Sequence, residues 1–168
     1  MSIHTTDVAE PTLTLREATP ADEFFLFRVY ADSRREELAR VAWGDDERHA
    51  FLASQFAMQY RYYREHYDGA TYHVVLADGQ PVGRLFLARW PDEIRIMDIA
   101  LLTERRGFGI GTRLLRALCD EADTIGVTIS IHVEKQNRAR GLYRRFGFEE
   151  HEDRGVYLYL VREPRRVS

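Results

Sequence analysis

Three glycines stand at every second position within residues 105–112, which read Arg-Arg-Gly-Phe-Gly-Ile-Gly-Thr. An apolar, β-branched run (94–102) precedes this stretch and a leucine-rich run begins at Thr112, so the pattern predicts a strand, a glycine turn and a helix start. A helix start leaves N–H groups unpaired at the positive end of its dipole, and glycine lets a ligand approach the main chain closely. This chemistry suits an anion such as a phosphate, and Arg105 and Arg106 add positive charge beside it.

The glycine spacing differs from the two familiar nucleotide-binding motifs. No Gly-Lys-Ser/Thr ending is present, which excludes the Walker pattern, and Gly111 comes one residue too early for the dinucleotide fingerprint Gly-x-Gly-x-x-Gly. The pattern Gln/Arg-x-x-Gly-x-Gly/Ala does fit, with Arg106, Gly109 and Gly111 in its defined positions. In this stretch the chain resembles the GNAT superfamily of N-acetyltransferases, which use this loop to bind the pyrophosphate of acetyl-coenzyme A. The alternative interpretation is a glycine turn that serves only tight packing before a helix.

A second segment strengthens the resemblance. Residues 136–148 read Gln-Asn-Arg-Ala-Arg-Gly-Leu-Tyr-Arg-Arg-Phe-Gly-Phe, and the superfamily commonly has Asn-x-x-Ala-x-x-Leu-Tyr-x-x-x-Gly-Phe about one strand and one helix after the glycine loop. The residues that match in register are Ala139, Leu142, Tyr143, Gly147 and Phe148. Gln136 takes the place of the family asparagine, and Asn137 lies one residue closer. Either residue can meet the pantetheine arm, and Asn137 can instead cap a helix.

The resemblance also implies where the cosubstrate lies. In the superfamily, the strand before the glycine loop and the strand after the next helix splay apart. The pantetheine arm enters the resulting V and pairs with exposed main chain as a strand would. Here the V would lie between residues 96–102 and 130–133, with backbone groups near Leu101 and Leu102 facing the cofactor and its thioester carbonyl. The residues implied to bind acetyl-CoA are Leu101, Leu102, Arg106, Gly107, Phe108, Gly109, Ile110, Gly111, Thr112, Asn137 and Tyr143.

Acetyl transfer to an amine needs a neutral amine, a stabilised oxyanion, and a proton or hydrogen bond for the departing thiolate. Direct attack in a ternary complex needs no nucleophilic residue on the enzyme, which fits a chain whose single cysteine, Cys119, falls on an apolar helix face. Tyr143 matches the family tyrosine and is the predicted general acid toward the thiolate, because a phenol is a suitable donor at neutral pH. The alternative is a tyrosine that only packs beside Phe146 and Phe148.

Three residues are candidates for the general base. Asp98 interrupts an apolar strand, where a carboxylate must be solvated by a cleft or hydrogen-bonded internally, so a purely structural carboxylate is the alternative. Glu93 matches a base position used in some GNAT members, although a solvated glutamate at a strand start also explains it. His132 shares the polar face of its strand with Ser130 and Glu134, where it can line the cleft or relay a proton through water. A surface strand face, or a sheet face under a helix, also explains the polar residues Ser130, His132 and Glu134.

A sheet with flanking helices is needed to position these segments. Hydrophobic periodicity and turn residues predict strands at 12–18, 72–77, 82–90, 93–102, 127–133, 148–152 and 156–162, and helices at 20–40, 46–66, 112–124 and 138–146. The order β-α-α-β-β-β-α-β-α-β-β predicts an α/β (α+β) fold with a central mixed, mostly antiparallel sheet and helices on both faces, which the GNAT resemblance also implies. We expect a single domain over residues 12–163, after a flexible tail at 1–11.

Length and composition limit the classes of partner. A chain of 168 residues with net charge −3 suits one domain and does not favour binding to nucleic acid or an anionic membrane. A single cysteine, no signal peptide and no apolar run of about 18 residues predict a cytoplasmic protein. No Cys/His cluster has metal-site spacing, so no metal is expected. Because dimers are frequent in the superfamily, the resemblance carries the expectation of a homodimer.

These observations predict an N-acetyltransferase that moves an acetyl group from acetyl-CoA to a primary amine by direct attack in a ternary complex. The acceptor is a small-molecule amine or a peptide or protein amine. Two alternatives stay open: a catalytically silent acyl-CoA-binding sensor or partner-binding module of the same fold, and an enzyme that uses another acyl donor such as succinyl-CoA.

Overall fold

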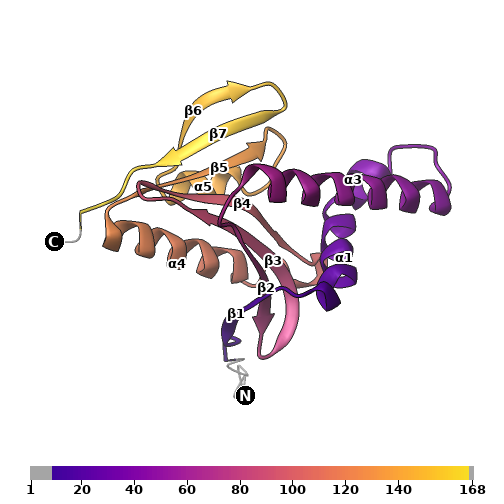
Figure 1. Cartoon of the computed structure of the whole chain (residues 1–168), viewed down its shortest axis with the longest axis horizontal. Coiled ribbons are helices and arrows are strands. Elements are labelled where there is room, and N and C mark those ends of the chain that lie inside the picture. Colours follow the sequence, from indigo (N-terminus) through magenta and orange to yellow (C-terminus); the bar gives the residue numbers. More distant parts are fainter. Residues whose placement is uncertain (1–8, 167–168) are drawn as a thin grey trace, which may run out of the picture.

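A computed structural model describes residues 9–166 as a seven-stranded mixed sheet with helices packed on it (Figure 1). The strand order is β1-β2-β3-β4-β5-β7-β6. The strands are β1 (Leu13–Glu17), β2 (Thr71–Ala77), β3 (Gln80–Arg89), β4 (Glu93–Leu101), β5 (Thr128–Glu134), β6 (Glu149–Arg154) and β7 (Tyr157–Arg162). The helices are α1 (Glu23–Ser33), α2 (Arg35–Leu38), α3 (Asp45–His66), α4 (Ile110–Ile125) and α5 (Arg140–Arg145), with 3-10 turns η1 (Pro20–Asp22) and η2 (Thr103–Arg105). This architecture confirms the predicted fold class.

The first helix ends earlier than the sequence pattern predicts. The pattern predicts one helix to residue 40, whereas α1 ends at Ser33 and the short α2 follows it. The Ser33 hydroxyl donates to the Tyr30 carbonyl at 2.6 Å, and such a side-chain bond competes with the helical ladder. Asp32, in the last turn of α1, contacts Thr103 of η2.

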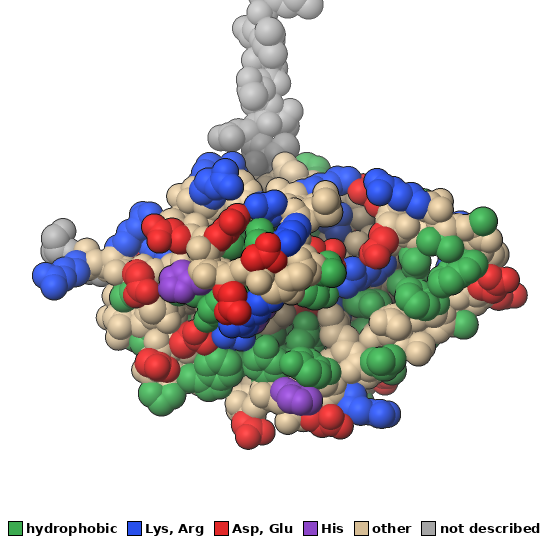
Figure 2. All heavy atoms as spheres, turned by 90° about the horizontal axis from the view of Figure 1, so that it is seen from above, with side chains coloured by type: hydrophobic (Ala, Val, Ile, Leu, Met, Phe, Trp, Pro, Cys, Tyr) green, Lys and Arg blue, Asp and Glu red, His purple; other side chains and the backbone are tan. Residues whose placement is uncertain are grey.

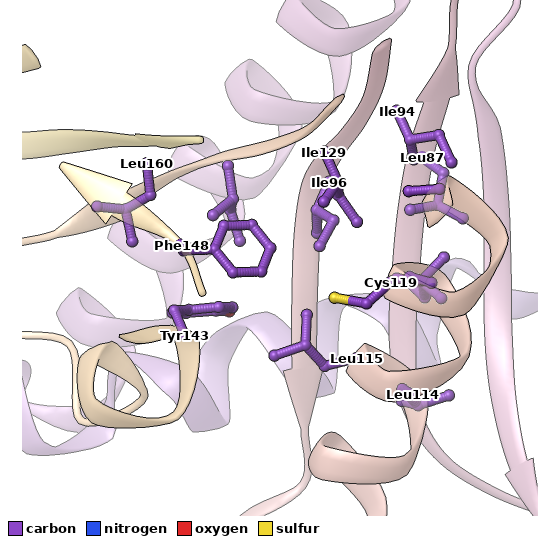
Figure 3. Packing of buried hydrophobic residues seen from close by; sticks show 14 of the residues in the cluster. Leu87, Ile94, Ile96, Leu114, Leu115, Cys119, Ile129, Tyr143, Phe148 and Leu160 are labelled. Atoms are coloured by element: carbon purple, nitrogen blue, oxygen red, sulfur yellow. The ribbon is translucent and has the colours of Figure 1, made fainter. Parts of the chain in front are cut away.

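The helices cover both faces of the sheet, and the alternation along β3 shows which helix covers which face. Leu85 and Leu87 belong to the hydrophobic cluster beneath α4 and α5, whereas Phe86 belongs to the cluster beneath α1 and α3. Figure 3 shows Leu115 and Cys119 of α4 directed toward the sheet residues of the first cluster. Below, these two sides of the sheet are called the α4 face and the α3 face.

The predicted apolar side of α4 is buried against the sheet. Its buried residues include Leu114, Leu115, Leu118, Cys119 and Ala122, and burying each leucine side chain contributes about 2 kcal/mol. Burial raises the pKa of the Cys119 thiol to about 11, which fits the predicted role as a core residue. The helix begins at residue 110 rather than 112, because the Arg113 amide already donates to the Gly109 carbonyl at 3.0 Å.

The sheet is open between β4 and β5, the only two neighbouring strands that run parallel within the described chain. Their ladder covers only Glu93–Ile96 of β4 and Thr128–Ile131 of β5. Met97 is an extra residue relative to β3, and such a bulge bends its strand. Residues 97–101 of β4 therefore diverge from residues 132–134 of β5, which remain paired with β7. We call this gap the strand opening; it begins slightly further along both strands than the sequence analysis predicts.

Three further expectations concern the chain as a whole. The predicted tail covers residues 1–11, of which residues 1–8 lie outside the described part. Within residues 9–166, no helix has the length and apolar character needed to cross a membrane. The same described stretch has no group of three or more His, Cys, Asp or Glu side chains arranged to hold a metal ion.

Candidate active site

The glycine loop leaves a run of main-chain N–H groups without protein partners. The amides of Arg105 and Arg106 close the turn η2, and the next backbone amide to find a partner is that of Arg113, which donates to the Gly109 carbonyl. Within the described chain, the six N–H groups of residues 107–112 form no hydrogen bond. They stand at the start of the long helix α4, where the helix dipole favours negative charge. This geometry suits an anionic group such as a pyrophosphate.

Glycine has different roles at different positions of this loop. Gly107 and Gly109 have φ angles of 83° and 80°, which residues with a Cβ rarely adopt. Gly111 has no such angle, and a Cβ added there would meet only Leu101 Cδ1 at 3.8 Å, an ordinary contact. The fold therefore requires glycine at 107 and 109 but tolerates a small side chain at 111.

The other predicted loop residues divide into exposed and buried ones. Arg106 is exposed, and its Nε donates to the Leu101 carbonyl at 3.2 Å. Phe108 is 72% exposed, so both side chains are free to contact a ligand. Ile110 is buried and can contribute only its main chain, and Thr112 is half-buried.

A buried carboxylate that the sequence analysis did not identify holds the start of the loop. Asp32, near the end of α1, accepts hydrogen bonds from the Thr103 backbone N–H at 2.5 Å and from the Thr103 hydroxyl at 2.7 Å. Its other oxygen is ion-paired with Arg35 at 2.5 Å. Burial tends to raise the pKa of Asp32, but the Thr103 hydrogen bonds outweigh burial and hold the pKa below its usual value. The ionised carboxylate therefore fixes η2, the turn that leads into the glycine loop.

The main chain at the end of β4 turns alternately toward β3 and toward the strand opening. The Leu102 amide donates to the Val82 carbonyl at 2.9 Å, toward β3. Because successive residues of a strand point their N–H and C=O groups to opposite edges, Leu101 directs its main chain into the strand opening. Of the two residues predicted to face the thioester, Leu101 has the required orientation, whereas the Leu102 amide is already engaged.

Tyr143 lies in the core of the α4 face, where α5 packs on the sheet. Its side chain is 4% exposed, and its ring meets that of Phe148 edge-on with centroids 5.5 Å apart (Figure 3). Burial, and after it the negative charge of Asp98, raise the pKa of the Tyr143 hydroxyl well above its usual value. The phenol is therefore protonated at neutral pH and can donate a proton or a hydrogen bond.

Asp98 is ion-paired with Arg84 of β3, a residue that the sequence analysis did not identify. Arg84 is 2% exposed; its Nη2 also reaches Gln59 Oε1 at 3.2 Å, while its Nε and Nη1 have no partner among the described residues. Burial and then the Asp98 charge raise the pKa of Tyr63 on the α3 face, as they do for Tyr143 on the α4 face. Asp98 points to the α3 face, where its cross-strand neighbour Phe86 also lies, on the part of β4 that borders the strand opening.

Glu93 is engaged within the closed part of the β4–β5 ladder. Its Oε2 accepts from Arg95 Nη2 at 3.2 Å, and its Oε1 accepts from the Tyr159 hydroxyl at 3.2 Å. It is paired with Thr128 rather than placed beside the strand opening. Through Tyr159, Glu93 links β4 to β7, which is a structural role.

His132 borders the strand opening, but its ring nitrogen is occupied. Its Nε2 lies 2.6 Å from Arg154 Nη1, and its ring stacks on Tyr159 with centroids 4.9 Å apart. Because a guanidinium only donates, Nε2 is the acceptor of this bond. Burial, followed by the charges of Arg95 and Arg154, lowers the pKa of His132 to about 4. The imidazole is therefore neutral at neutral pH, with this lone pair engaged.

Asn137 closes the turn before α5. Its Oδ1 accepts from the Ala139 amide at 2.8 Å, which forms an Asx turn; the N-cap of α5 is Ala139, so Asn137 does not take the predicted capping role. The helix itself begins at Arg140, two residues later than predicted. The exposed side-chain NH₂ of Asn137 stays available for a ligand.

Two pockets of about 260 and 400 Å³ lie away from the strand opening: one is lined by Asp32 and Arg48, and the other by Tyr60 and Tyr72 at the end of α3. Figure 2 shows the side of the molecule that carries β6, β7 and α3, where hydrophobic side chains gather around a shallow hollow with acidic and basic side chains beside it.

Comparisons with solved structures agree with this architecture. An N-acetyltransferase, PaiA, from Thermoplasma acidophilum, solved with coenzyme A, superposes with a TM-score of 0.67 at 16% identity, covering 90% of this chain and 99% of that chain. An acetyltransferase from Thermus thermophilus gives a TM-score of 0.65 at 20% identity, covering 90% and 97%. At these identities the likeness shows the fold.

Sequence comparisons identify the family. A Bacillus subtilis (strain 168) protein, named as a ribosomal protein bS18-alanine N-acetyltransferase, is 32% identical over 83 residues, which are 48% of this chain. The match spans 54% of that relative, about half of its length. The profile of the Acetyltransferase (GNAT) family matches residues 22–148, a range that contains Asp32, the glycine loop and Tyr143. The protein described here is therefore a member of the acetyltransferase (GNAT) family.

Proposed function

We propose that the protein transfers an acetyl group from acetyl-CoA to a primary amine by direct attack in a ternary complex. The observation that carries this proposal is the run of unpartnered N–H groups at residues 107–112, which follows directly on the open end of β4. The Thermoplasma acidophilum neighbour was solved in complex with coenzyme A, which supports coenzyme A as a ligand of this fold. The predicted binding residues Leu101, Arg106 and Phe108 each offer main chain or an accessible side chain on this path.

The proposed reaction needs two proton transfers, and two residues supply them. The neutral amine attacks the thioester carbonyl carbon, a C–N bond forms, and the C–S bond breaks. Tyr143, which its raised pKa keeps protonated, donates its hydroxyl proton to the departing thiolate sulfur and regains a proton from solvent. Asp98, held by Arg84, accepts the proton that the amine loses, directly or through water. The Leu101 main chain hydrogen-bonds the thioester carbonyl in this scheme.

Replacing the proposed acid tests this function. Tyr143→Phe keeps the ring that packs on Phe148, so we expect acetyl-CoA affinity to change little. We expect kcat to fall by about 10- to 100-fold, because that is the contribution typical of a positioned general acid. Steady-state kinetics over a panel of amines measure kcat, and calorimetry measures the affinity for acetyl-CoA.

Two outcomes would change the proposal. An unchanged kcat would remove Tyr143 from the acid role. Tight binding of acetyl-CoA without transfer to any amine would instead support a silent acyl-CoA-binding module, and the same panel with succinyl-CoA tests the alternative donor.

The setting of the reaction is part of the proposal. The name of the Bacillus subtilis relative refers to an alanine of a ribosomal protein, so peptide N-termini belong in the acceptor panel beside small amines. A cytoplasmic location is supported by a single, buried, free thiol. The homodimer stays a prediction from the family resemblance, which sedimentation of the purified protein tests.

A further inference from the structure

We propose that the acceptor carries a second positive charge in addition to the amine that is acetylated. This inference rests on the proposed acetyl transfer and concerns the wall of the strand opening on the α3 face. Two carboxylates, Asp98 and Glu134, lie along this wall, and a third, Glu93, lies on the same face within the closed part of the β4–β5 ladder; an arginine is paired with each. The pairs are Arg84–Asp98, Arg34–Glu134 and Arg95–Glu93.

In each pair the carboxylate is the more exposed partner. The side-chain exposures are 2% for Arg84 against 18% for Asp98, and 26% for Arg34 against 35% for Glu134. The third pair has 12% for Arg95 against 18% for Glu93. Arg84 is therefore buried behind Asp98, whereas in the other two pairs both partners can be reached from solvent, the carboxylate by a slightly larger fraction of its side chain.

The arginines of the two pairs beside the strand opening both lie over the ring of Tyr30. The guanidinium carbons of Arg34 and Arg84 each lie 5.6 Å from the ring centroid of Tyr30. Tyr30, which lies on α1, thus packs against both arginines. The carboxylates paired with them come from the two diverging strands, Asp98 from β4 and Glu134 from β5. Both carboxylates lie beyond the last paired residues of the β4–β5 ladder, so one stands on each side of the strand opening.

The remaining groups on this wall also suit a cation. Tyr157 is 43% exposed, and Tyr159 lies beside it on the same face of β7. Tyrosine rings attract cations through their negative faces. The other charged group here, Arg154, lies over the Tyr159 ring and is paired with Glu152, which is again the more exposed partner. A ligand with two positive charges can therefore place one ammonium at Asp98 for acetylation and the other group at Glu134.

A matched set of acceptors tests this proposal on the unmodified protein. We compare 1,4-diaminobutane with butylamine, and the dipeptide amide Ala-Lys with Ala-norleucine, so that each pair differs in one positive charge. We expect kcat/KM for the doubly charged member to be about tenfold higher or more, because a charge-assisted hydrogen bond contributes to binding on that scale. The first pair tests a free polyamine and the second a basic peptide N-terminus.

The failures of the two proposals are distinguishable in this experiment. Equal kcat/KM within both pairs would overturn the second-charge proposal and leave acetyl transfer standing. No transfer to any of the four acceptors, although acetyl-CoA binds, would overturn the proposed function and this proposal with it.

A variant locates the second charge. In Glu134→Gln we expect the ratio of kcat/KM for the doubly charged acceptor to kcat/KM for the singly charged one to fall about tenfold, toward one. Glu150→Gln is the matched control, because Glu150 is an exposed glutamate on β6 that is likewise paired with an arginine, Arg140, away from the strand opening. We expect the control to keep the preference. A preference that survives Glu134→Gln would contradict the assignment of the second charge to Glu134.

Discussion

At the scale of single residues, the candidate catalytic groups differ in whether their polar atoms already have partners. Both carboxylate oxygens of Glu93 and the Nε2 atom of His132 are engaged. By contrast, Oδ1 of Asp98 and the hydroxyl of Tyr143 have no hydrogen-bond partner within residues 9–166, and neither is among the fully buried polar atoms. These two atoms are therefore the ones that can meet a substrate, which is why the proposed chemistry uses them.

The state of His132 can be tested by titration. Its pKa of about 4 lies below the ordinary value of 6.5, because of burial first and then the charges of Arg95 and Arg154, with Glu152 acting in the opposite direction. Between these two values the unfolded chain binds more protons than the folded one, so stability falls as the pH drops from 6.5 toward 4. After allowance for solvent screening, we expect this loss to be on the order of 1 kcal/mol.

The control for this effect is His132→Gln, whose amide oxygen can still accept from Arg154. We expect its free energy of unfolding to fall less than that of the unmodified protein between pH 7 and pH 4.5, as measured by urea titration. Proton NMR of the imidazole should show a neutral ring down to about pH 4. A ring that titrates near 6.5 would contradict the buried, arginine-flanked environment.

At the scale of elements, α1 and the glycine loop are coupled through one side chain. Asp32→Ala removes both hydrogen bonds to Thr103 and leaves Arg35 without its partner. We expect the free energy of unfolding to fall by about 2–3 kcal/mol, because hydrogen bonds to a buried charge are lost. We also expect weaker acetyl-CoA binding, since η2 no longer fixes the loop.

Asp32→Asn is the matched control, because its amide oxygen can still accept from Thr103. It should lose less stability than Asp32→Ala in denaturant titrations and bind acetyl-CoA more tightly in calorimetry. An Asp32→Ala protein as stable and as tight-binding as the original would show that α1 does not position the loop.

The elements that the sequence predicted share a local cause. The glycine turn and α4 follow from residues that are near neighbours in the chain, namely glycines with positive φ and an apolar helical stripe. The end of α1 at Ser33 and the bulge at Met97 were not predicted, because each depends on contacts that no periodicity reveals. The bulge matters most, since it sets where the strand opening begins.

At the scale of the whole molecule, the site is assembled from segments that are far apart in sequence. Asp32 contacts Thr103 across 71 positions, and Arg34 contacts Glu134 across 100. Sequence motifs identified the loop and Tyr143 but missed Arg84 and Asp32, because only the fold shows that a charged residue is buried and which partner stabilises it. The pairing of Asp98 with Arg84 and of Glu134 with Arg34 was missed for the same reason.

The central claim is that the loop amides bind the pyrophosphate of acetyl-CoA, and a pair of substitutions at Gly111 tests it most directly. A Cβ fits at this position, so Gly111→Ala and Gly111→Val should both fold, as thermal unfolding would confirm. We expect calorimetry to show near-normal acetyl-CoA affinity for Gly111→Ala and at least a tenfold loss for Gly111→Val, whose two additional methyl groups add bulk to the loop on the side that faces Leu101. Equal affinity in the two variants would contradict the claim and leave the glycine loop as a packing device.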